Sequence, residues 1–398
     1  MSEKKRMVPK LRFPGFTDDW EQRKLGEVGS VSMCRRIFKE QTSENGDIPF
    51  YKIGTFGGEA DAFISREVFE EYRAKYPYPK KGDILLSASG SIGRIVEFTG
   101  KNEYFQDSNI VWLNHDERLD NSFLKCFYSI VKWAGIEGST IKRLYNNNIL
   151  NTVINLPTVE EQQKIGAYFA NLDHLITLHQ RKLDHLKDKK KSLLQKMFPK
   201  KGEDFPELRF PGFTDAWEQR DIGKLVDVYD GTHQTPKYTD SGVMFLSVED
   251  IKTLQSEKYI SEEAFENEFK IRPERGDVLM TRIGDIGTVN VVDSDEAIAY
   301  YVSLALLKQK ELEPYFLKAS IQSVTVQNEI WKRTLHIAFP KKINKNEIAK
   351  VPMHYPSKDE QGQIGFFFKE IDQIITLHQR KLDHLQDLKK ALLQSMFV

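Results

Sequence analysis

The sequence Ile-Thr-Leu-His-Gln-Arg-Lys-Leu-Asp-His-Leu occurs twice in this chain, at Ile176–Leu186 and at Ile375–Leu385, and the two copies are identical. Around them a longer likeness runs from Thr158 to Phe198 and from Ser357 to Phe397. Solenoid repeats have periods of 20–50 residues, so a period of about half the chain indicates a duplicated module instead. An account of this chain must explain why these segments are alike while the residues between them differ.

Each copy of the longer repeat predicts one long helix. Both begin with a capping-box pattern, Thr158 to Glu161 and Ser357 to Glu360, directly after a proline. Positions spaced alternately by four and three residues then form a heptad seam, which is typical of two helices that pair as a coiled coil. We expect an antiparallel, intramolecular pair, in which each helix spans roughly 55–60 Å at 1.5 Å per residue. The predicted seam consists of Ile165, Phe169, Leu172, Ile176, His179, Leu183, Leu186, Ile364, Phe368, Ile371, Ile375, His378, Leu382 and Leu385.

Composition sets the class of protein but not its target. The chain has 398 residues, 40% of them hydrophobic, which suits two or three globular domains. Basic and acidic residues balance at 58 each, so any nucleic-acid surface must be local. The two cysteines, Cys34 and Cys126, form no CxxC pair, which fits a reducing cytoplasm and excludes a cysteine zinc cluster. Without a signal peptide or a long apolar run, we expect a cytoplasmic protein that does not span a membrane.

A second repeat opens each half of the chain. Leu11–Val28 and Leu208–Leu225 share the letters LRFPGFTD and WEQR, and we expect Trp20 and Trp217 to be buried anchors. Each half therefore consists of a motif, a variable body and a long helix. The domain boundaries that we predict are residues 1–157 for the first globular domain, 158–198 for the central helix, 199–356 for the second globular domain and 357–398 for the C-terminal helix.

The two variable bodies, roughly residues 29–156 and 226–355, share faint landmarks. Ile84–Phe98 and Val278–Val292 both read as a strand, a turn with two glycines and a second strand, which predicts a hairpin in each body. Short helices are expected to follow at Ser122–Lys132 and Pro314–Ser323. Strands and loops dominate elsewhere, so the predicted fold class is α+β.

Polar, loop-like stretches in the bodies are the candidates for DNA binding. The first body contains Ile141–Asn148, with two cations, an aromatic ring and three amides, and the second contains Asp230–Tyr238 and a Lys-Lys pair. Asn and Gln can pair with adenine, while Arg and Lys contact guanine or phosphate; ordinary solvated loops are the alternative. The predicted DNA-binding residues are Arg94, Lys142, Arg143, Tyr145, Asn146, Asn147, Thr232, His233, Gln234, Thr235, Lys237, Arg282, Lys341 and Lys342.

No motif for catalysis or metal binding is found in the sequence. GxxxxGK[ST], HExxH, GxGxxG and GxSxG are all missing, and the histidines are not at metal-ligand spacing. We interpret His179 and His378, which fall on the predicted seam, as packing or hydrogen-bonding residues, with a pH-sensitive joint as the alternative. The sequence therefore favours a binding protein with no catalytic residues and no metal site.

The order motif, body, helix, used twice, resembles the specificity subunit of type I restriction–modification enzymes. The resemblance is carried by LRFPGF…W and by LPTVEEQQKI…LHQRKLDHL…KKSLLQKMF, and it extends over essentially the whole chain. It implies two target-recognition domains related by a pseudo-twofold axis, each recognising one half of an asymmetric, interrupted DNA sequence. It also implies that the helices form the spacer and dock two copies of the modification (methylase) subunit, which a motor–nuclease restriction subunit then joins.

On this resemblance the chain itself carries no cofactor. S-adenosylmethionine would bind the methylase partner, and ATP and Mg the restriction partner.

A helix of 55–60 Å corresponds to roughly 16–18 base pairs at ~3.4 Å each. Outside the seam, the residues expected to dock the methylase are Gln180, Arg181, Lys182, Gln379, Arg380 and Lys381. The alternatives are a self-contained nuclease or methyltransferase with an unrecognised site, and a coiled-coil scaffold that joins separate chains.

Overall fold

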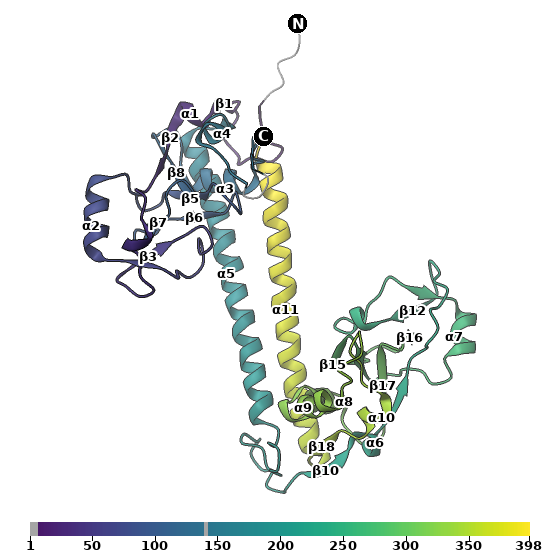
Figure 1. Ribbon diagram of the computed structural model, residues 1–398. Helices are drawn as coiled ribbons and strands as arrows, with labels where there is room; N and C mark the ends of the chain where they lie inside the picture. Colours follow the sequence, from purple (N-terminus) through teal and green to yellow (C-terminus); the bar gives the residue numbers. More distant parts are fainter. Residues whose placement is uncertain (1–6, 139–141) are drawn as a thin grey trace. The chain divides into compact units, whose positions relative to one another are not determined.

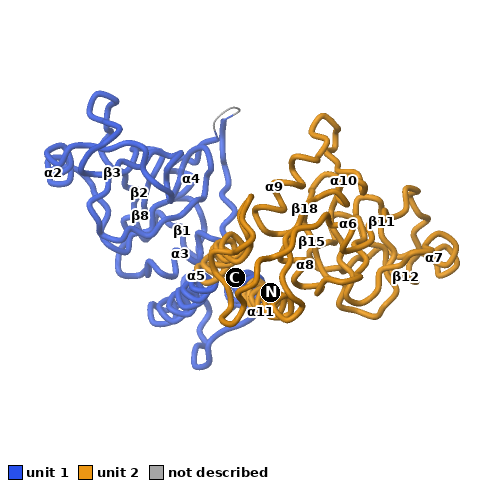
Figure 2. The backbone as a smooth tube through the Cα atoms, turned by 90° about the horizontal axis from the view of Figure 1, so that it is seen from below, with its two compact units in different colours: residues 1–179, 381–398 blue, residues 180–380 orange. Residues whose placement is uncertain are grey.

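The computed structural model describes residues 7–138 and 142–398, and the chain divides into two compact units. The first unit comprises residues 1–179 and 381–398, and the second comprises residues 180–380 (Figure 2). Each unit contains one variable body, one part of each long helix and one copy of the LRFPGF motif. The helices therefore contribute to both units.

Two long helices, α5 (Val159–Lys196) and α11 (Lys358–Met396), occupy the predicted segments (Figure 1). They pack together in antiparallel fashion. In the first unit Lys389 Nζ donates to Asp173 Oδ1 at 2.5 Å, and in the second unit Lys190 Nζ donates to Asp372 Oδ1 at 2.6 Å. A late residue of one helix thus meets an early residue of the other. The predicted helix pair within one chain is confirmed, and all the predicted seam positions are buried or half-buried.

The start of each long helix is held by an ion pair that the capping-box interpretation missed. Thr158 Oγ1 accepts from the backbone N–H of Glu161 at 3.4 Å, as expected. The fully buried Glu161 carboxylate does not close the box, because it accepts two hydrogen bonds from Arg12, at 2.7 and 2.8 Å. Arg209 and Glu360 repeat this contact in the second unit, with two bonds of 2.7 Å. The hydrogen bond to Glu161 raises the pKa of Arg12 against the opposing effect of burial.

These ion pairs explain the LRFPGF repeat, because its arginine is the partner of the helix carboxylate. The tryptophans that follow are buried, as predicted. Trp20 meets Phe123 and Phe397 edge-on, with ring centroids 5.8 and 6.0 Å apart. The Trp217 ring centroid lies 5.8 Å from the ring centroids of both Phe198 and Phe316. Each motif therefore attaches its body to the end of a long helix.

Within the first unit, a four-stranded sheet of order β2-β8-β5-β6 lies beside a three-stranded sheet of order β4-β3-β7, and β1 pairs with β9. The short helices flank these sheets (Figure 1). The strands are β1 (Glu21–Lys24), β2 (Gly29–Met33), β3 (Ile48–Tyr51), β4 (Phe63–Ile64), β5 (Ile84–Ser87), β6 (Ile95–Glu97), β7 (Tyr104–Phe105), β8 (Ile110–His115) and β9 (Val153–Leu156). The helices are α1 (Leu25–Val28), α2 (Arg66–Lys75), α3 (Asn121–Ile130) and α4 (Asn146–Leu150), with a 3-10 turn at Lys39–Gln41.

The second unit repeats this topology, with sheets of order β11-β17-β14-β15 and β13-β12-β16 and a β10-β18 pair. Its strands are β10 (Glu218–Asp221), β11 (Val226–Asp230), β12 (Val243–Leu246), β13 (Tyr259–Ile260), β14 (Val278–Ile283), β15 (Asp285–Val291), β16 (Ile298–Tyr300), β17 (Leu304–Gln309) and β18 (Pro352–Tyr355). Its helices are α6 (Ile222–Leu225), α7 (Glu262–Glu268), α8 (Pro314–Gln322), α9 (Val324–Arg333) and α10 (Lys345–Ala349), with a 3-10 turn at Val248–Asp250.

Alternating side chains of the central strands supply two cores in each unit. Along β14, Val278 and Met280 belong to the core that includes the long helices, whereas Leu279 belongs to the core of the three-stranded sheet. In the first unit Leu86 and Leu85 divide in the same way. Successive strand residues face opposite sides of a sheet, so these strands are buried on both faces. The alternation explains their nearly continuous apolar sequence.

The predicted hairpins and short helices are present. β5 pairs with β6 and β14 with β15, both antiparallel; α8 falls within its expected segment, and α3 begins one residue before its expected segment. Gly90 (φ +63°) and Gly284 (φ +81°) occupy the left-handed region in the turns, where a side chain would be strained. The predicted α+β fold with two β-rich bodies and two paired long helices is confirmed.

Candidate nucleic-acid interface

The predicted DNA-binding loop of the first body is attached to the end of β5 by a short ladder. The Leu144 N–H donates to Ala88 O at 2.8 Å, and the Gly90 N–H donates to Lys142 O at 2.9 Å. On the other side, Arg143 and Glu137 exchange two backbone bonds, of 2.7 and 3.1 Å. The loop therefore runs as an extra edge segment, and α4 follows it. Ile141, which opens the candidate stretch, lies outside the described residues.

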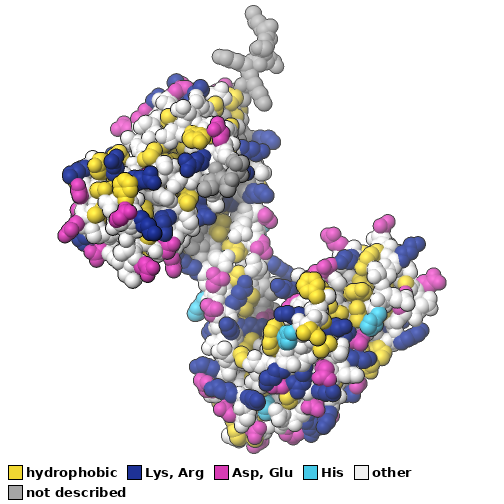
Figure 3. Space-filling model, viewed as in Figure 1, with side chains coloured by type: hydrophobic (Ala, Val, Ile, Leu, Met, Phe, Trp, Pro, Cys, Tyr) yellow, Lys and Arg dark blue, Asp and Glu magenta, His cyan; other side chains and the backbone are white. Residues whose placement is uncertain are grey.

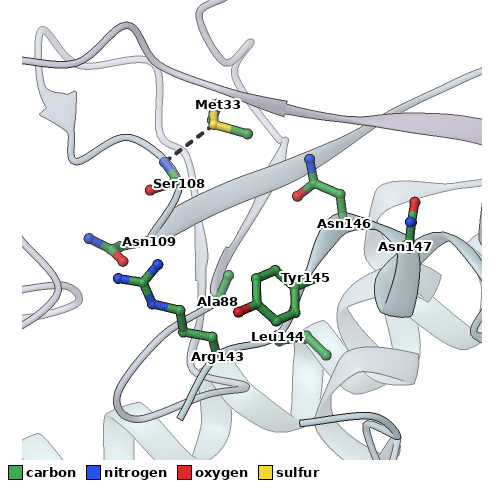
Figure 4. A pocket seen from close by; sticks show the side chains of 9 residues that line it. All are labelled: Met33, Ala88, Ser108, Asn109, Arg143, Leu144, Tyr145, Asn146 and Asn147. Atoms are coloured by element: carbon green, nitrogen blue, oxygen red, sulfur yellow. Dashed lines mark hydrogen bonds between the residues drawn. The ribbon is translucent and has the colours of Figure 1, made fainter. Parts of the chain in front are cut away.

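This loop lines a surface pocket of about 370 Å³ (Figure 4). The pocket is formed by Met33, Ala88, Ser108, Asn109, Arg143, Leu144, Tyr145, Asn146 and Asn147. In Figure 4 the Arg143 and Asn109 side chains extend on the same side, and Asn146 and Asn147 project from the start of α4. Ser89 Oγ donates to Asn109 Oδ1 at 2.6 Å, which orients the Asn109 amide. The pocket thus combines a cation, amides and a half-exposed tyrosine.

The second body has the same ladder, and this equivalence was missed from the sequence. The Ile343 N–H donates to Arg282 O at 3.0 Å, and the Gly284 N–H donates to Lys341 O at 2.8 Å. Lys341 and Lys342 therefore correspond to Lys142 and Arg143, at an offset of 199 residues. The same offset separates the long helices, so extending that register towards the N-terminus would have found the match. All four cations are exposed, and no described carboxylate pairs with them.

Arg282 does not belong to this exposed surface, and we correct its proposed role. Arg282 is 5% exposed, and its Nε and Nη1 donors are already engaged. Nη1 contacts Asp230 Oδ1 at 2.7 Å and Val302 O at 3.2 Å, while Nε donates to Ile343 O at 3.0 Å. Arg282 instead joins the start of the Thr232–Lys237 loop to the Lys341–Lys342 segment.

The loop that carries Thr232, His233, Gln234, Thr235 and Lys237 leaves the end of β11. Thr232 is half-buried and exchanges backbone bonds with Tyr300 and Val302 at 3.1 and 2.9 Å, whereas the other four side chains are exposed. A Cβ on Gly231 would lie 2.4 Å from Tyr300 O, so the backbone passes too close for any other residue. The loop is thus anchored at its first residue and presents polar side chains beyond it.

The counterpart of this loop in the first body is Cys34–Phe38, which was also missed. It follows β2 as the Thr232 loop follows β11, at the offset of 197 residues that separates the two LRFPGF motifs. Arg35 and Arg36 are exposed there, and their guanidinium groups lie 5.2 Å from the Tyr76 ring and 5.7 Å from the Phe38 ring. Met33, directly before this segment, lines the pocket of Arg143.

Arg94 is exposed but extends away from the pocket. Its Nη1 donates to Phe56 O at 2.7 Å, and its Cδ would lie 3.6 Å from a Cβ on Gly57. Its side chain therefore contacts the loop around residues 52–58. The structure brings together most of the other predicted residues in two clusters, one in each body.

The outer faces of the long helices present the predicted docking residues. Gln180, Arg181, Lys182, Arg380 and Lys381 are exposed and Gln379 is half-buried. Apolar side chains that the sequence analysis did not single out accompany them, namely Leu175 and Leu178 on α5 and Ile374 and Leu377 on α11. Lys182 follows Leu175 by seven residues and Leu178 by four, so they share one helix face. The same face recurs in both repeats.

Other predicted features have structural roles. His179 and His378 are half-buried, and each has an interaction with another residue. Cys34 and Cys126 are buried free thiols, and burial raises the pKa of each to about 12.

Within residues 7–138 and 142–398, no cluster of His, Cys, Asp and Glu is suited to a metal ion. No helix in the described part of the chain is long and apolar enough to cross a membrane.

The fold defines a class of architecture: two β-rich bodies with equivalent, cation-bearing loop clusters, carried by one helix pair. Two stretches, residues 17–188 and 214–387, match the family of type I restriction modification DNA specificity domains. These matches cover most of the chain, so the chain belongs to this family. It is the DNA specificity subunit of a type I restriction–modification system, and its role there is non-catalytic.

Curated relatives have the same description. A putative type I restriction enzyme specificity subunit of Haemophilus influenzae is 60% identical over 152 residues, which are 38% of this chain and 40% of that protein. The MjaVIII specificity subunit of Methanocaldococcus jannaschii is 22% identical over 78% of this chain and 74% of that protein. A putative MjaX specificity subunit of the same organism is 21% identical over 94% and 92%. The chain thus spans less than half of the first relative and most of the other two.

Solved structures show the same fold. The S subunit of a type I restriction-modification system from M. genitalium superposes with a TM-score of 0.65 at 16% identity, covering 98% of this chain and 99% of that one. A chain from a structural study of complex assembly and conformational transition of the type I R-M system gives a TM-score of 0.52 at 18% identity, covering 97% and 99%.

Proposed function

We propose that each body recognises one half of an asymmetric, interrupted DNA target. The observation that carries this proposal is the pair of equivalent loop clusters with different side chains. The first body presents Lys142, Arg143 and Tyr145, whereas the second presents Lys341, Lys342 and the Thr232–Lys237 loop. Bases are distinguished by the side chains that reach their edges, so unlike clusters on one fold should recognise unlike half-sites.

The helix pair sets the distance between the half-sites in this proposal. α5 contains 38 residues, which corresponds to roughly 57 Å at 1.5 Å per residue. The seam residues predicted from the heptad pattern are the ones that we assign to this spacing role. Leu183 and Leu382 are the strongest candidates among them, because both are fully buried and both lie in the identical eleven-residue stretch.

Two copies of the methylase subunit dock on the repeated outer faces of the helices. Supporting this, Leu178 is 46% exposed and Leu377 is 67% exposed, at equivalent positions of an identical sequence. Identical surfaces suit identical partners, and solvated leucines at helical spacing are typical of a partner site. In this assembly the methylase supplies S-adenosylmethionine, and a restriction subunit that joins it uses ATP and Mg. In this proposal the four functional segments are residues 1–157, 158–198, 199–356 and 357–398.

The docking proposal is tested by counting methylase copies per chain with light scattering. The wild type should bind two copies. Leu178→Asp and Leu377→Asp should each bind one, because each removes one of two equivalent faces, and the double variant should bind none. Gln386→Asp, an exposed change directly after the identical eleven-residue stretch, is the matched control and should bind two. Loss of both copies in a single variant would contradict two independent, equivalent sites.

The specificity role is tested by assaying the same preparations for methyl transfer. The chain alone should transfer no methyl group from S-adenosylmethionine to DNA, whereas the complex should methylate one split sequence. Methyl transfer by the purified chain alone would contradict the proposal.

A further inference from the structure

The segment between α9 and Lys342 exposes two large apolar side chains at its tip. Ile337 is 99% exposed and Phe339 is 103% exposed, and no other large hydrophobic side chain in the described part of the chain exceeds 67%. Neither one belongs to a hydrophobic core of the unit. Fully solvated Ile and Phe contribute nothing to the fold, so their presence at a surface loop indicates a binding role.

The base of this segment is held by contacts on both branches of the loop. The Leu335 N–H donates to Lys342 O at 2.8 Å, which closes the loop. The His336 ring centroid lies 4.2 Å from that of Trp331, and His336 Nε2 is 2.9 Å from Trp331 O. Lys341 Nζ lies 4.8 Å from the Trp331 ring on the other branch. Both branches are thus held by one tryptophan, while the tip extends beyond it.

The charges around this segment are those of a surface for an anionic partner. Lys341 and Lys342 flank the tip, and no described carboxylate pairs with them. The nearby acidic residue Glu329 is already engaged by Lys332 and Arg333, at 2.5 Å each. Figure 3 shows hydrophobic side chains interspersed with His and with charged side chains of both signs on the visible face of the second unit. The Ile283–Lys342 bridge joins the segment directly to the candidate interface.

We propose that Ile337 and Phe339 form a wedge that inserts between two stacked base pairs of the half-site recognised by the second body. Lys341 and Lys342 contact the flanking phosphates, and the insertion unstacks one step and bends the duplex. Apolar side chains on DNA-binding proteins act in this way, and Phe and Ile are among the residues used. The inference rests on the proposed DNA-recognition function and adds a residue-level mechanism to one half of it.

The aromatic residue of the wedge, Phe339, has no counterpart in the sequence of the first body. Between the ladder residues Leu335 and Lys342 the second body has six residues, HIAFPK, whereas between Glu137 and Arg143 the first has five, GSTIK. The first-body stretch contains no aromatic residue, and its residues 139–141 lie outside the described part of the chain. Unstacking is therefore expected in one half of the target.

The test uses the complex of the full chain with its methylase and duplexes that carry 2-aminopurine at successive positions of the target. On binding, the wild-type complex should raise the fluorescence at one step of the second half-site, because the probe brightens when it is unstacked. Phe339→Ala should abolish this rise and weaken specific binding by about 10- to 100-fold, the range for losing one aromatic stack. Phe339→Trp should retain the specific binding, since another aromatic ring can still enter the step. Phe205→Ala, which removes a 52%-exposed phenylalanine of the same unit, is the control and should change neither.

The outcomes separate the wedge from the function on which it rests. Specific binding without any Phe339-dependent fluorescence change would overturn the wedge and leave the recognition proposal intact. Loss of methylase copies from the Phe339→Ala complex, with DNA unstacking unchanged, would assign the tip to a protein partner and also overturn the wedge. If the wild-type complex shows no sequence-specific binding, the recognition proposal and the wedge fail together.

Discussion

The two bodies are alike where they join the helices and unlike where they face a ligand. The buried pairs Arg12–Glu161 and Arg209–Glu360 have the same bidentate geometry. By contrast, the first body has an amide-rich pocket around Arg143, and the second has a polar loop and an apolar tip. Identical sequence is found where the same contact must be made twice. Divergence extends through both bodies and includes the loops that we propose to recognise the target.

The shared contacts should produce the largest effects, equal in the two bodies. Arg12→Ala and Arg209→Ala should each lower the free energy of unfolding by about 3–5 kcal/mol, because each leaves a fully buried carboxylate without its partner. Urea unfolding of the two variants measures this. Lys350→Ala, which breaks an exposed pair with Glu347, is the control and should cost less than about 1 kcal/mol. A large difference between the two arginine variants would contradict the equivalence of the attachments.

The divergent loops should act on one half-site each. Arg143→Ala and Lys342→Ala should each weaken DNA binding by about 1–3 kcal/mol if the side chain contacts a base. Binding of the complex to duplexes altered in one half-site measures the effect. Each variant should lose discrimination in its own half only. If one variant relaxed discrimination in both halves, the assignment of one body to one half-site would be wrong.

The Cys34–Phe38 segment should contribute through phosphates and therefore more weakly. Arg35→Ala and Arg36→Ala should reduce affinity similarly for all sequences, and each should lower the slope of log affinity against log salt by about 1. Titrations at several salt concentrations test this, with Lys39→Ala at the adjacent 3-10 turn as the comparison. A sequence-dependent loss in either arginine variant would instead assign that residue to base recognition.

The smallest effect is expected at a position that differs between the two bodies, in the strand that precedes each long helix. His354 on β18 is buried, whereas the equivalent residue on β9 is Asn155. Burial lowers the pKa of His354 from its ordinary value of 6.5, although Asp204 at 3.6 Å opposes the shift. Neutral His354 therefore contributes fully to the free energy of unfolding above pH 6.5. This contribution is lost as the pH falls from 6.5 through the lowered pKa of the folded state. Melting temperatures between pH 7.5 and 5 should fall less steeply in His354→Asn than in the wild type, and an unchanged slope would contradict this.

Local patterns predicted the helices, and long-range contacts decided the rest. The heptad spacing and the glycine turns lie within one element each, so the long helices and hairpins followed from the sequence. Glu161 was assigned to a capping box because its actual partner, Arg12, is 149 residues away. Arg282 was predicted to bind DNA because the residues next to it in the sequence did not indicate its buried ion pair with Asp230, which is 52 residues away. The equivalence of Lys142 and Lys341 could have been predicted, since the 199-residue offset between the long helices also relates these two residues.

The central claim is that one shared frame carries two independent recognition bodies. It is tested most directly by replacing residues 226–355 with the corresponding body of another family member and mapping methylated bases in DNA from cells that express the chain with its methylase. The account predicts that the wild type yields a split sequence of two unlike halves, and that the exchange changes one half while the other half and the spacer stay the same. A change in both halves, or an uninterrupted target, would contradict it.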